Sequence, residues 1–403
     1  MTISAPIYLD GLSTLPIATE ARAAMLDAWA APGNSASPHG AGERAAAIIA
    51  DARNEVALLI GAAAPEILFT SGATEANNLA IMGVARALRE LGSARRRLIV
   101  SAVEHKAVLE PARALEREGF EIALAPVDRH GRLDVPAYHA LLDEDVLLAS
   151  IMAVNNETGV VQPVAEAAAI AHAAGALFHC DAAQAVGKIA LDVLALDVDY
   201  MSLSAHKFYG PMGVGALYVS AAVPRPLPLQ FGGGQQGGQR PGTEPVALLS
   251  GLGAAARTSR ERLATDAAHA TKLSESFLAA LRERQLRFAR ITGDHQVVPG
   301  SGALEIEGVD ADALCMRLAR SVHLSTGSAC TSGQLRVSHV LEAMGFSAER
   351  AGSVVRIFWS RYNSRDEVAT AADEICRAAL QSRLAYWRAC PVASAHEEDR
   401  GAN

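Results

Sequence analysis

Short apolar runs alternate with alanine-rich stretches between about residues 65 and 220. Seven of these runs have the length of strands: Ile67–Thr70, Leu98–Ser101, Glu121–Ala125, Leu147–Val154, Ala176–Cys180, Tyr200–Leu203 and Gly215–Val219. The intervening stretches, such as Pro163–Ala174, have the length of crossover helices. Because strands buried on both faces read as continuous apolar runs, the pattern predicts an α/β fold whose large domain holds a mostly parallel seven-stranded sheet.

A Pro-rich loop, Pro224–Pro228, and a Gly-rich loop, Phe231–Gly238, interrupt this pattern. A long helical stretch follows from about Pro245 to Arg284, and shorter elements come after it: strand-like Ala303–Ile306, helical Ala311–Ala319, strand-like Val354–Trp359 and a helix from about Arg365 to Trp387. This last third predicts a smaller α+β domain, with the long helix as connector. The expected boundaries are 16–258 for the large domain, 1–15 and 259–388 for the small domain, and 389–403 for a disordered tail.

A chain of 403 residues is too long for one simple core, which agrees with two domains. Its net charge of -8 argues against direct binding of nucleic acid. No apolar run approaches the ~18 residues that span a bilayer, and the first residues lack the features of a signal peptide. A cytoplasmic protein with no membrane partner is expected. The five cysteines lack the C-x-x-C spacing of a zinc or redox site, so free thiols and no metal site are expected.

Ligands of parallel sheets gather at the carboxyl ends of the strands, where three segments stand out. At Ser71-Gly72 a strand ends and a helix begins, which suits a phosphate or forms an ordinary N-cap. Asp181 also follows a strand, where it can cap the next helix or keep a ring nitrogen protonated. Lys207 lies between two apolar runs. It is either a surface-loop lysine or a poorly solvated one that can bind a carbonyl cofactor covalently.

These segments resemble the class V aminotransferase branch of the type I pyridoxal-phosphate enzymes. The resemblance to cysteine desulfurases runs from about Tyr8 to about Leu380. It includes further segments of this chain: Pro32-Gly33-Asn34 with His39 and Gly42, Val103–Val108, Val154–Gly159, Arg240–Thr243 and Ser325–Gly333. The resemblance implies the type I pyridoxal-phosphate transferase fold and pyridoxal 5'-phosphate as cofactor.

The resemblance also implies roles around the cofactor ring. Lys207 carries the cofactor and moves protons between it and the substrate. Asp181 pairs with the pyridine nitrogen, and His105 stacks on the ring. Gln184 and Asn156 form hydrogen bonds near the ring oxygen, and Asn156 also reaches the substrate carboxylate.

The remaining implied contacts lie at the phosphate and at the substrate. The residues expected to hold the phosphate are Ala73, Thr74, Ser204 and His206. Thr243 is expected to reach the phosphate of a neighbouring subunit, which implies a homodimer with shared active sites. Arg356 matches the arginine that binds the substrate carboxylate, a task that suits a planar bidentate side chain.

Cys330 determines the expected reaction. It lies in a run of Ser, Thr, Gly and Ala that is typical of a mobile loop. The resemblance implies that its thiolate attacks the sulfur of L-cysteine, so that a persulfide forms on Cys330 and L-alanine is released. A thiol with a pKa of ~8.5 needs a nearby cation or proton acceptor, and His105 is a candidate. An inert buried thiol is the alternative, and is the expectation for Cys180, Cys315 and Cys376.

Departures from the family pattern cluster around the expected substrate entrance: Asp10–Pro16, Gln235-Gln236, Ala205 and Ile357–Arg361. They leave two other functions open, a selenocysteine lyase or small-amino-acid aminotransferase of the same family, and a non-enzymatic sulfur-transfer scaffold. The expected partners are L-cysteine and a sulfur-acceptor protein, such as an iron–sulfur scaffold or a thiolation enzyme.

Overall fold

The computed structural model describes residues 5–327 and 337–389. Its largest sheet has the order β2-β8-β7-β6-β5-β3-β4. The strands are β2 (Ile67–Thr70), β3 (Arg97–Ser101), β4 (Glu121–Ala125), β5 (Val146–Ser150), β6 (Leu177–Asp181), β7 (Tyr200–Ser204) and β8 (Gly215–Val219). From β7 to β4 all neighbours are parallel, whereas β8 runs antiparallel to β2 and β7. The predicted α/β fold with a mostly parallel seven-stranded sheet is therefore confirmed.

The strand predicted at Leu147–Val154 was wrong in its extent, whereas the other six lie within one residue of their observed bounds. β5 ends at Ser150. The next four residues stay buried, and Val154 forms only an isolated antiparallel bridge to Val161. An apolar run indicates that a segment is buried, not that it belongs to a sheet. Residues 151–154 are apolar and buried, but they lie beyond the end of β5.

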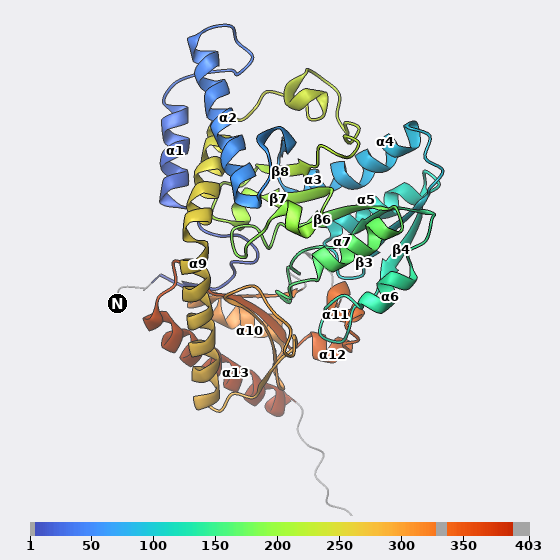
Figure 1. Cartoon of the computed structure of the whole chain (residues 1–403). Helices are drawn as coiled ribbons and strands as arrows, with labels where there is room; N and C mark the ends of the chain where they lie inside the picture. Colours follow the sequence, from blue (N-terminus) through green and yellow to red (C-terminus); the bar gives the residue numbers. More distant parts are fainter. Residues whose placement is uncertain (1–4, 328–336, 390–403) are drawn as a thin grey trace, which may run out of the picture.

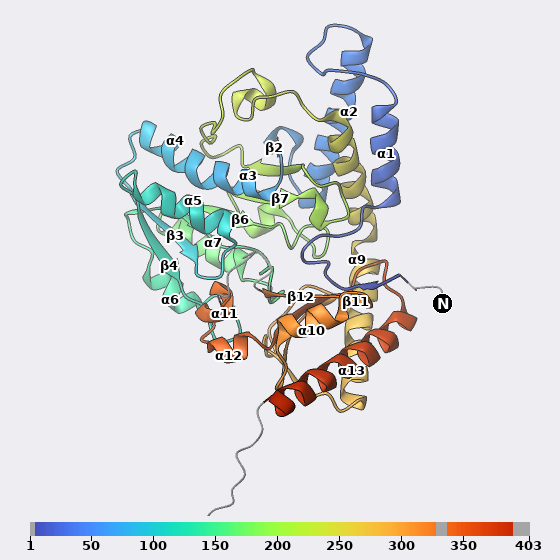
Figure 2. The same cartoon turned by 180° about the vertical axis from the view of Figure 1, so that it is seen from behind.

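Helices cover both faces of this sheet. Leu98 and Val100 of β3 pack in a core with α3 (Ala73–Asn78), α4 (Val84–Glu90) and α5 (Lys106–Glu116). Ile99 between them packs on the other face, in the core that includes α2 (Gly40–Ile60) and α7 (Val164–Ala173). Figure 1 shows α7 in front of the sheet, and Figure 2 shows α3, α4 and α5 on the opposite side. Burial on both faces explains why the strands read as continuous apolar runs.

A second sheet of order β12-β13-β10-β9 forms the smaller α+β part that the sequence predicts. Its strands are β9 (Phe288–Arg290), β10 (Ser301–Ile306), β12 (Ser325–Thr326) and β13 (Val354–Phe358), and α10 (Ala311–Leu318) and α13 (Arg365–Ala389) pack on it. The N-terminal strand β1 (Ile7–Tyr8) pairs in parallel with β11 (Val322–His323). Strand β1 therefore lies beside the C-terminal third of the chain.

The long helix α9 (Val246–Glu283) joins the two parts (Figure 1). At 1.5 Å per residue it is about 57 Å long. It packs against α1 (Thr19–Trp29), α2 and α13. The remaining helical elements are η1 (Ala64–Glu66), η2 (Leu79–Gly83), α6 (Val135–Ala140), α8 (Val193–Leu196), η3 (Ala205–Lys207), η4 (Gln235–Gly238), α11 (His339–Ala343) and α12 (Ala348–Ala351).

The predicted domain boundaries stay a prediction, and of the predicted tail, residues 390–403 lie outside the described residues. Among the helices of the described chain, none is both long enough and apolar enough to cross a membrane.

Candidate active site

A cavity of about 470 Å³ lies at the carboxyl ends of the central strands. This volume is in the range of small-molecule sites. The cavity brings together most of the residues singled out in the sequence: Ala73, Thr74, His105, Asn156, Asp181, Gln184, Ser204, His206, Lys207 and Arg356. Leu12 and Ser13 of the N-terminal segment also line it. Thr243 does not line it and is exposed, and Cys330 lies outside the described residues.

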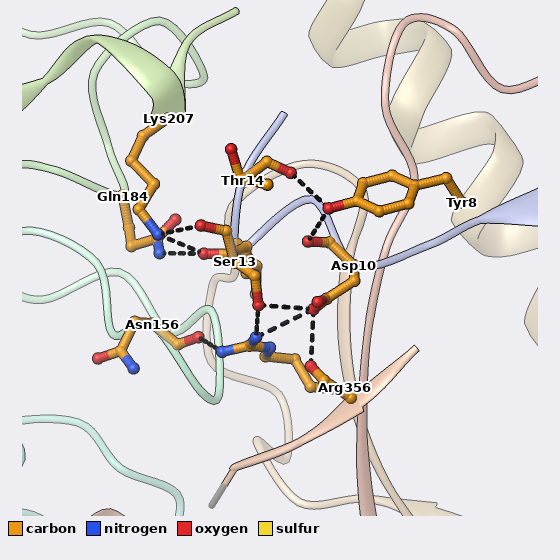
Figure 3. A network of polar contacts seen from close by, with 10 residues as sticks. Tyr8, Asp10, Ser13, Thr14, Asn156, Gln184, Lys207 and Arg356 are labelled. Carbon is orange, nitrogen blue, oxygen red and sulfur yellow. Dashed lines mark hydrogen bonds and ion pairs between the residues drawn. The ribbon is translucent and has the colours of Figure 1, made fainter. Parts of the chain in front are cut away.

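Lys207 ends the short turn η3 that follows the buried strand β7. Its Nζ donates hydrogen bonds of 2.7 Å to the carbonyl oxygens of Leu12 and Ser13 (Figure 3). Ala205, which starts this turn, is fully buried. The chain can turn tightly there because residue 210 is glycine, and a Cβ at Gly210 would lie 2.8 Å from the Cβ of Ala205. The side chain of Lys207 lines the cavity, so the interpretation of Lys207 as a surface-loop lysine is wrong.

Asp181 is the last residue of β6 and is 5% exposed. One carboxylate oxygen accepts a hydrogen bond of 2.9 Å from the backbone N–H of Ala183 in the turn that follows, and the helix-cap interpretation is wrong because the next helix, α8, is capped by Asp192. The other carboxylate oxygen of Asp181 accepts one of 2.7 Å from Nδ2 of Asn77. These donors hold the carboxylate where it lines the cavity, as pairing with a protonated ring nitrogen requires.

Asn77 has no role in the sequence-based prediction. Its local signal is its helical spacing from Ala73 and Thr74, which places it on the same side of α3 one turn later.

The expected phosphate end is built by a close approach of two chain segments. Gly72, with φ of 151°, precedes α3. A Cβ added at Gly215 would lie 2.7 Å from Gly72 Cα, so β8 can pass this turn only as glycine. The first N–H groups of a helix have no partner within it and suit an anion. The π-helical turn η2 and α4 extend α3 directly, which lengthens the helix that begins here.

Two histidines of the cavity are neutral at neutral pH. Burial lowers the pKa of His105, and the Lys207 charge adds to this, although Asp181 opposes it. Its Nδ1 accepts a hydrogen bond of 3.1 Å from the backbone N–H of Ala107. Burial and the charge of Lys207 lower the pKa of His206 to about 4. Because Nδ1 of His105 accepts from Ala107, the neutral ring carries its proton on Nε2, and the role of His105 as a proton acceptor stays a prediction.

Arg356 of β13 reaches the cavity from the smaller sheet, and its side chain is 5% exposed. Its Nη1 donates to the carbonyl oxygen of Asn156 at 2.8 Å. Its Nη2 contacts Oδ1 of Asp10 at 3.0 Å and also Oγ of Ser13 (Figure 3). Nε is buried without a hydrogen-bond partner in the described chain.

The residues of the cavity fit pyridoxal phosphate. Lys207 offers an amine, and Asp181 offers a fixed carboxylate. The turn at Gly72 offers backbone donors at the start of a helix, with Ser204 and His206 lining the same cavity. An amine, a carboxylate and an anion-binding turn are the set that this cofactor needs. The fold and the site therefore define a type I pyridoxal-phosphate enzyme.

Comparisons with known proteins assign the family. The family model "Aminotransferase class-V" matches residues 7–370. A protein named "Cysteine desulfurase IscS" from Anaeromyxobacter dehalogenans is 44% identical over 368 residues, 90% of each chain. The human "Cysteine desulfurase" is 42% identical over 367 residues, 90% of this chain and 79% of that one. The chain belongs to the class V aminotransferase family, which confirms the family and the cofactor predicted from the sequence.

Solved structures agree with this assignment. The structure titled "NIFS-LIKE PROTEIN" has a TM-score of 0.84 and 34% identity, and the match covers 92% of this chain and 98% of that one. The structure titled "SspA in complex with cysteine" has a TM-score of 0.77 and 33% identity, with coverage of 89% and 100%.

Proposed function

We propose that this chain is a cysteine desulfurase that converts L-cysteine to L-alanine and transfers the sulfur to Cys330 as a persulfide. The observation that carries the proposal is that Lys207, Asp181 and Arg356 line one cavity. A cofactor amine site and a binding site for an amino-acid carboxylate are thus adjacent. The similarity to cysteine desulfurases over 90% of the chain supports the same function.

Each residue has a task that follows from its position. Bound pyridoxal phosphate supplies an electron sink for the bonds at the substrate Cα. Arg356 binds the substrate carboxylate, and the Lys207 amine takes up and returns a proton at Cα. Asp181, held by Asn77, keeps a negative charge at the ring end of the cavity.

The sulfur step belongs to Cys330, whose thiolate attacks the substrate sulfur. The C–S bond of the substrate breaks and an S–S bond forms. The carbon that loses sulfur takes up a proton, so thiol plus cysteine becomes persulfide plus alanine. His105 is the proposed proton acceptor for the thiol.

The described cysteines do not suit this role. Burial raises the pKa of Cys180, which is fully buried. Burial also raises the pKa of Cys315 to about 12 and that of Cys376 above its usual value. Each is protonated at neutral pH and is a poor nucleophile, in agreement with the expectation that these three thiols are inert.

The test is an assay of the purified protein with L-cysteine and a reductant, in which sulfide and alanine are measured together. We expect equal amounts of both products. Cys330→Ala is expected to abolish both, whereas the matched variant Cys315→Ala retains them. Full activity of Cys330→Ala would refute the persulfide mechanism.

The same assay separates the alternatives. A selenocysteine lyase would release selenide from selenocysteine with a far higher kcat/KM than sulfide from cysteine, and an aminotransferase would produce a 2-oxo acid. A sulfur-transfer scaffold without enzymatic activity would purify without cofactor absorbance. The complete set of Lys207, Asp181, His105 and Gln184 in one cavity favours an enzyme.

The proposal includes a homodimer in the cytoplasm, in which Thr243 reaches the phosphate site of the partner subunit. Thr243 is exposed in the single chain, which is compatible with a contact to a partner subunit. The proposed acceptor of the persulfide is a protein, an iron–sulfur scaffold or a thiolation enzyme. Sedimentation of the purified protein tests the dimer, and transfer of labelled sulfur from Cys330 to candidate acceptors tests the partner.

A further inference from the structure

Lys188 is a buried lysine that the mechanism above does not use. It lies in the turn after β6 and is 6% exposed. Its Nζ donates to two neutral oxygens of Gln184, the carbonyl oxygen at 3.2 Å and Oε1 at 3.1 Å. Among the described residues no carboxylate forms an ion pair with it, and the Phe358 ring lies 5.5 Å from the nitrogen. A buried amine without a carboxylate is costly, and its presence calls for a function.

The Gln184 carboxamide has only one orientation that satisfies its neighbours. Its Nε2 donates to the carbonyl oxygen of Leu12 at 2.7 Å, and a carbonyl oxygen can only accept. Oε1 must therefore face Lys188, which supplies its donor. Leu12 O also accepts a hydrogen bond from Nζ of Lys207, so the Gln184 amide group and the Lys207 nitrogen meet at one oxygen. Figure 3 shows this convergence beside Ser13.

We infer that Lys188 is a positioning residue for the reaction, which acts by holding Gln184 Oε1 so that the Gln184 NH2 group faces the Lys207 end of the cavity. This inference rests on the proposed function and on the role that the family resemblance implies for Gln184, a hydrogen bond near the ring oxygen of the cofactor. A donor bonded to Oε1 also polarises the amide and strengthens its N–H as a donor. Without Lys188, Oε1 would be left buried and unsatisfied, and the amide could rotate.

The charges around Lys188 agree with this role. One charge acts on Lys188, that of Lys207 in η3, which adds to the effect of burial in lowering the pKa of Lys188. Lys188 in turn helps to lower the pKa of His206, which lies in the same short helix. The other groups at its nitrogen are the Gln184 oxygens and the Phe358 ring. A neutral Lys188 amine still donates a hydrogen bond, so the positioning does not depend on its charge.

The experiment is a pH titration of the visible absorbance of the cofactor-loaded enzyme, without substrate. Lys188→Met keeps the length and the apolar stem but removes the donor. We expect the apparent pKa of the absorbance change to rise by about 0.7 of a pH unit, the equivalent of one hydrogen bond of about 1 kcal/mol. The pKa rises because a hydrogen-bond donor near the ring oxygen stabilises the deprotonated form of the bound cofactor, and the variant weakens that donor. Lys272→Met, an exposed lysine on α9, is the matched control and should not shift it.

A double-mutant cycle shows whether Lys188 acts through Gln184. In a Gln184→Met background, Lys188→Met should add no further shift. An unchanged pKa in Lys188→Met, or an equal shift when Gln184 is already methionine, would overturn the inference. If Lys188→Met does not fold, Lys188→Gln, which keeps a shorter donor, replaces it and should shift the pKa by less than Gln184→Met does. Because the titration needs no substrate, its failure is distinguishable from failure of the desulfurase assay on the unmodified enzyme.

Discussion

Asp10 is a carboxylate of the chain itself that pairs with Arg356, the residue proposed to bind the substrate carboxylate. Its Oδ1 accepts from Arg356 Nη2 at 3.0 Å, from Ser13 Oγ at 2.9 Å and from Ser325 Oγ at 2.7 Å. An amino-acid substrate carries a carboxylate that needs the same guanidinium. Asp10→Asn removes the negative charge but retains an oxygen for the hydroxyl donors. We expect it to destabilise the protein and to strengthen binding of amino-acid ligands.

The magnitude follows from burial. Breaking a buried ion pair by neutralising one partner costs about 3–5 kcal/mol, because the other charge is left without compensation. The Arg356 side chain is 5% exposed and that of Asp10 is 22% exposed. Because Asp10 is partly exposed to solvent, we expect the loss of folding stability to lie at the lower end of this range, about 3 kcal/mol. In Asp10→Asn, a ligand carboxylate that pairs with Arg356 can regain these ~3 kcal/mol. The dissociation constant of the ligand then falls by about 100-fold, since each factor of ten corresponds to about 1.4 kcal/mol.

Two measurements on the cofactor-loaded enzyme test this reasoning. Urea unfolding gives the loss of stability, and titration with the product L-alanine, followed by cofactor absorbance, gives the affinity. Stability should fall while affinity for alanine rises, and alanine should restore part of the lost stability. Ser325→Ala, which removes a hydroxyl donor to Asp10 but keeps the backbone pairing of Ser325 with Arg356, should change alanine binding little. A parallel fall of stability and affinity would refute the competition, because Asp10 would then only shape the site.

Two further changes test other parts of the structure. Gly215→Ala would place a Cβ 2.7 Å from Gly72 Cα. It should lower stability by about 1–3 kcal/mol and weaken cofactor binding, measured by equilibrium dialysis, whereas Gly302→Ala, with open space at its Cβ, should do neither. Burial lowers the pKa of His172, but hydrogen bonds to Asp199 and a second carboxylate outweigh it and leave the pKa above 6.5. Its contribution to stability is therefore full below pH 6.5 and is lost as the pH rises through the folded-state pKa, and His172→Gln should remove this dependence from urea unfolding curves.

The positions of the strands along the chain, and the placement of Asp181 and Lys207 at one edge of the sheet, could be predicted because they depend on local patterns. Continuous apolar runs such as Gly215–Val219 mark strands buried on both faces, and the observed strand has these bounds. Asp181 and Lys207 each follow such a strand, and the parallel neighbours β6 and β7 bring their ends together. In a sheet of this kind, sequence position after a strand translates directly into spatial position.

The rest of the site depends on contacts that no local pattern contains. The carbonyl oxygens of Leu12 and Ser13 accept from Lys207, almost two hundred positions later, and backbone groups leave no trace in residue type. Lys188 has no signal in the sequence because its turn resembles an ordinary small-residue turn, and its proximity to the Phe358 ring of the other sheet depends on tertiary packing. Asp10–Pro16 was recognised only as a departure from the family pattern.

The segment around Ser13 explains why these distant residues belong to one site. The backbone carbonyl oxygen of Ser13 accepts from Lys207, which follows a strand of the large sheet. The Oγ of Ser13 contacts Arg356 of the small sheet (Figure 3). The cofactor end and the carboxylate end of the cavity are therefore joined through a single residue. If Lys207 held the cofactor covalently, as proposed, it would have fewer N–H groups to donate, and the carbonyls that accept from it would need other donors. Because Ser13 also contacts Arg356, a displacement of this segment would change the contacts of both side chains.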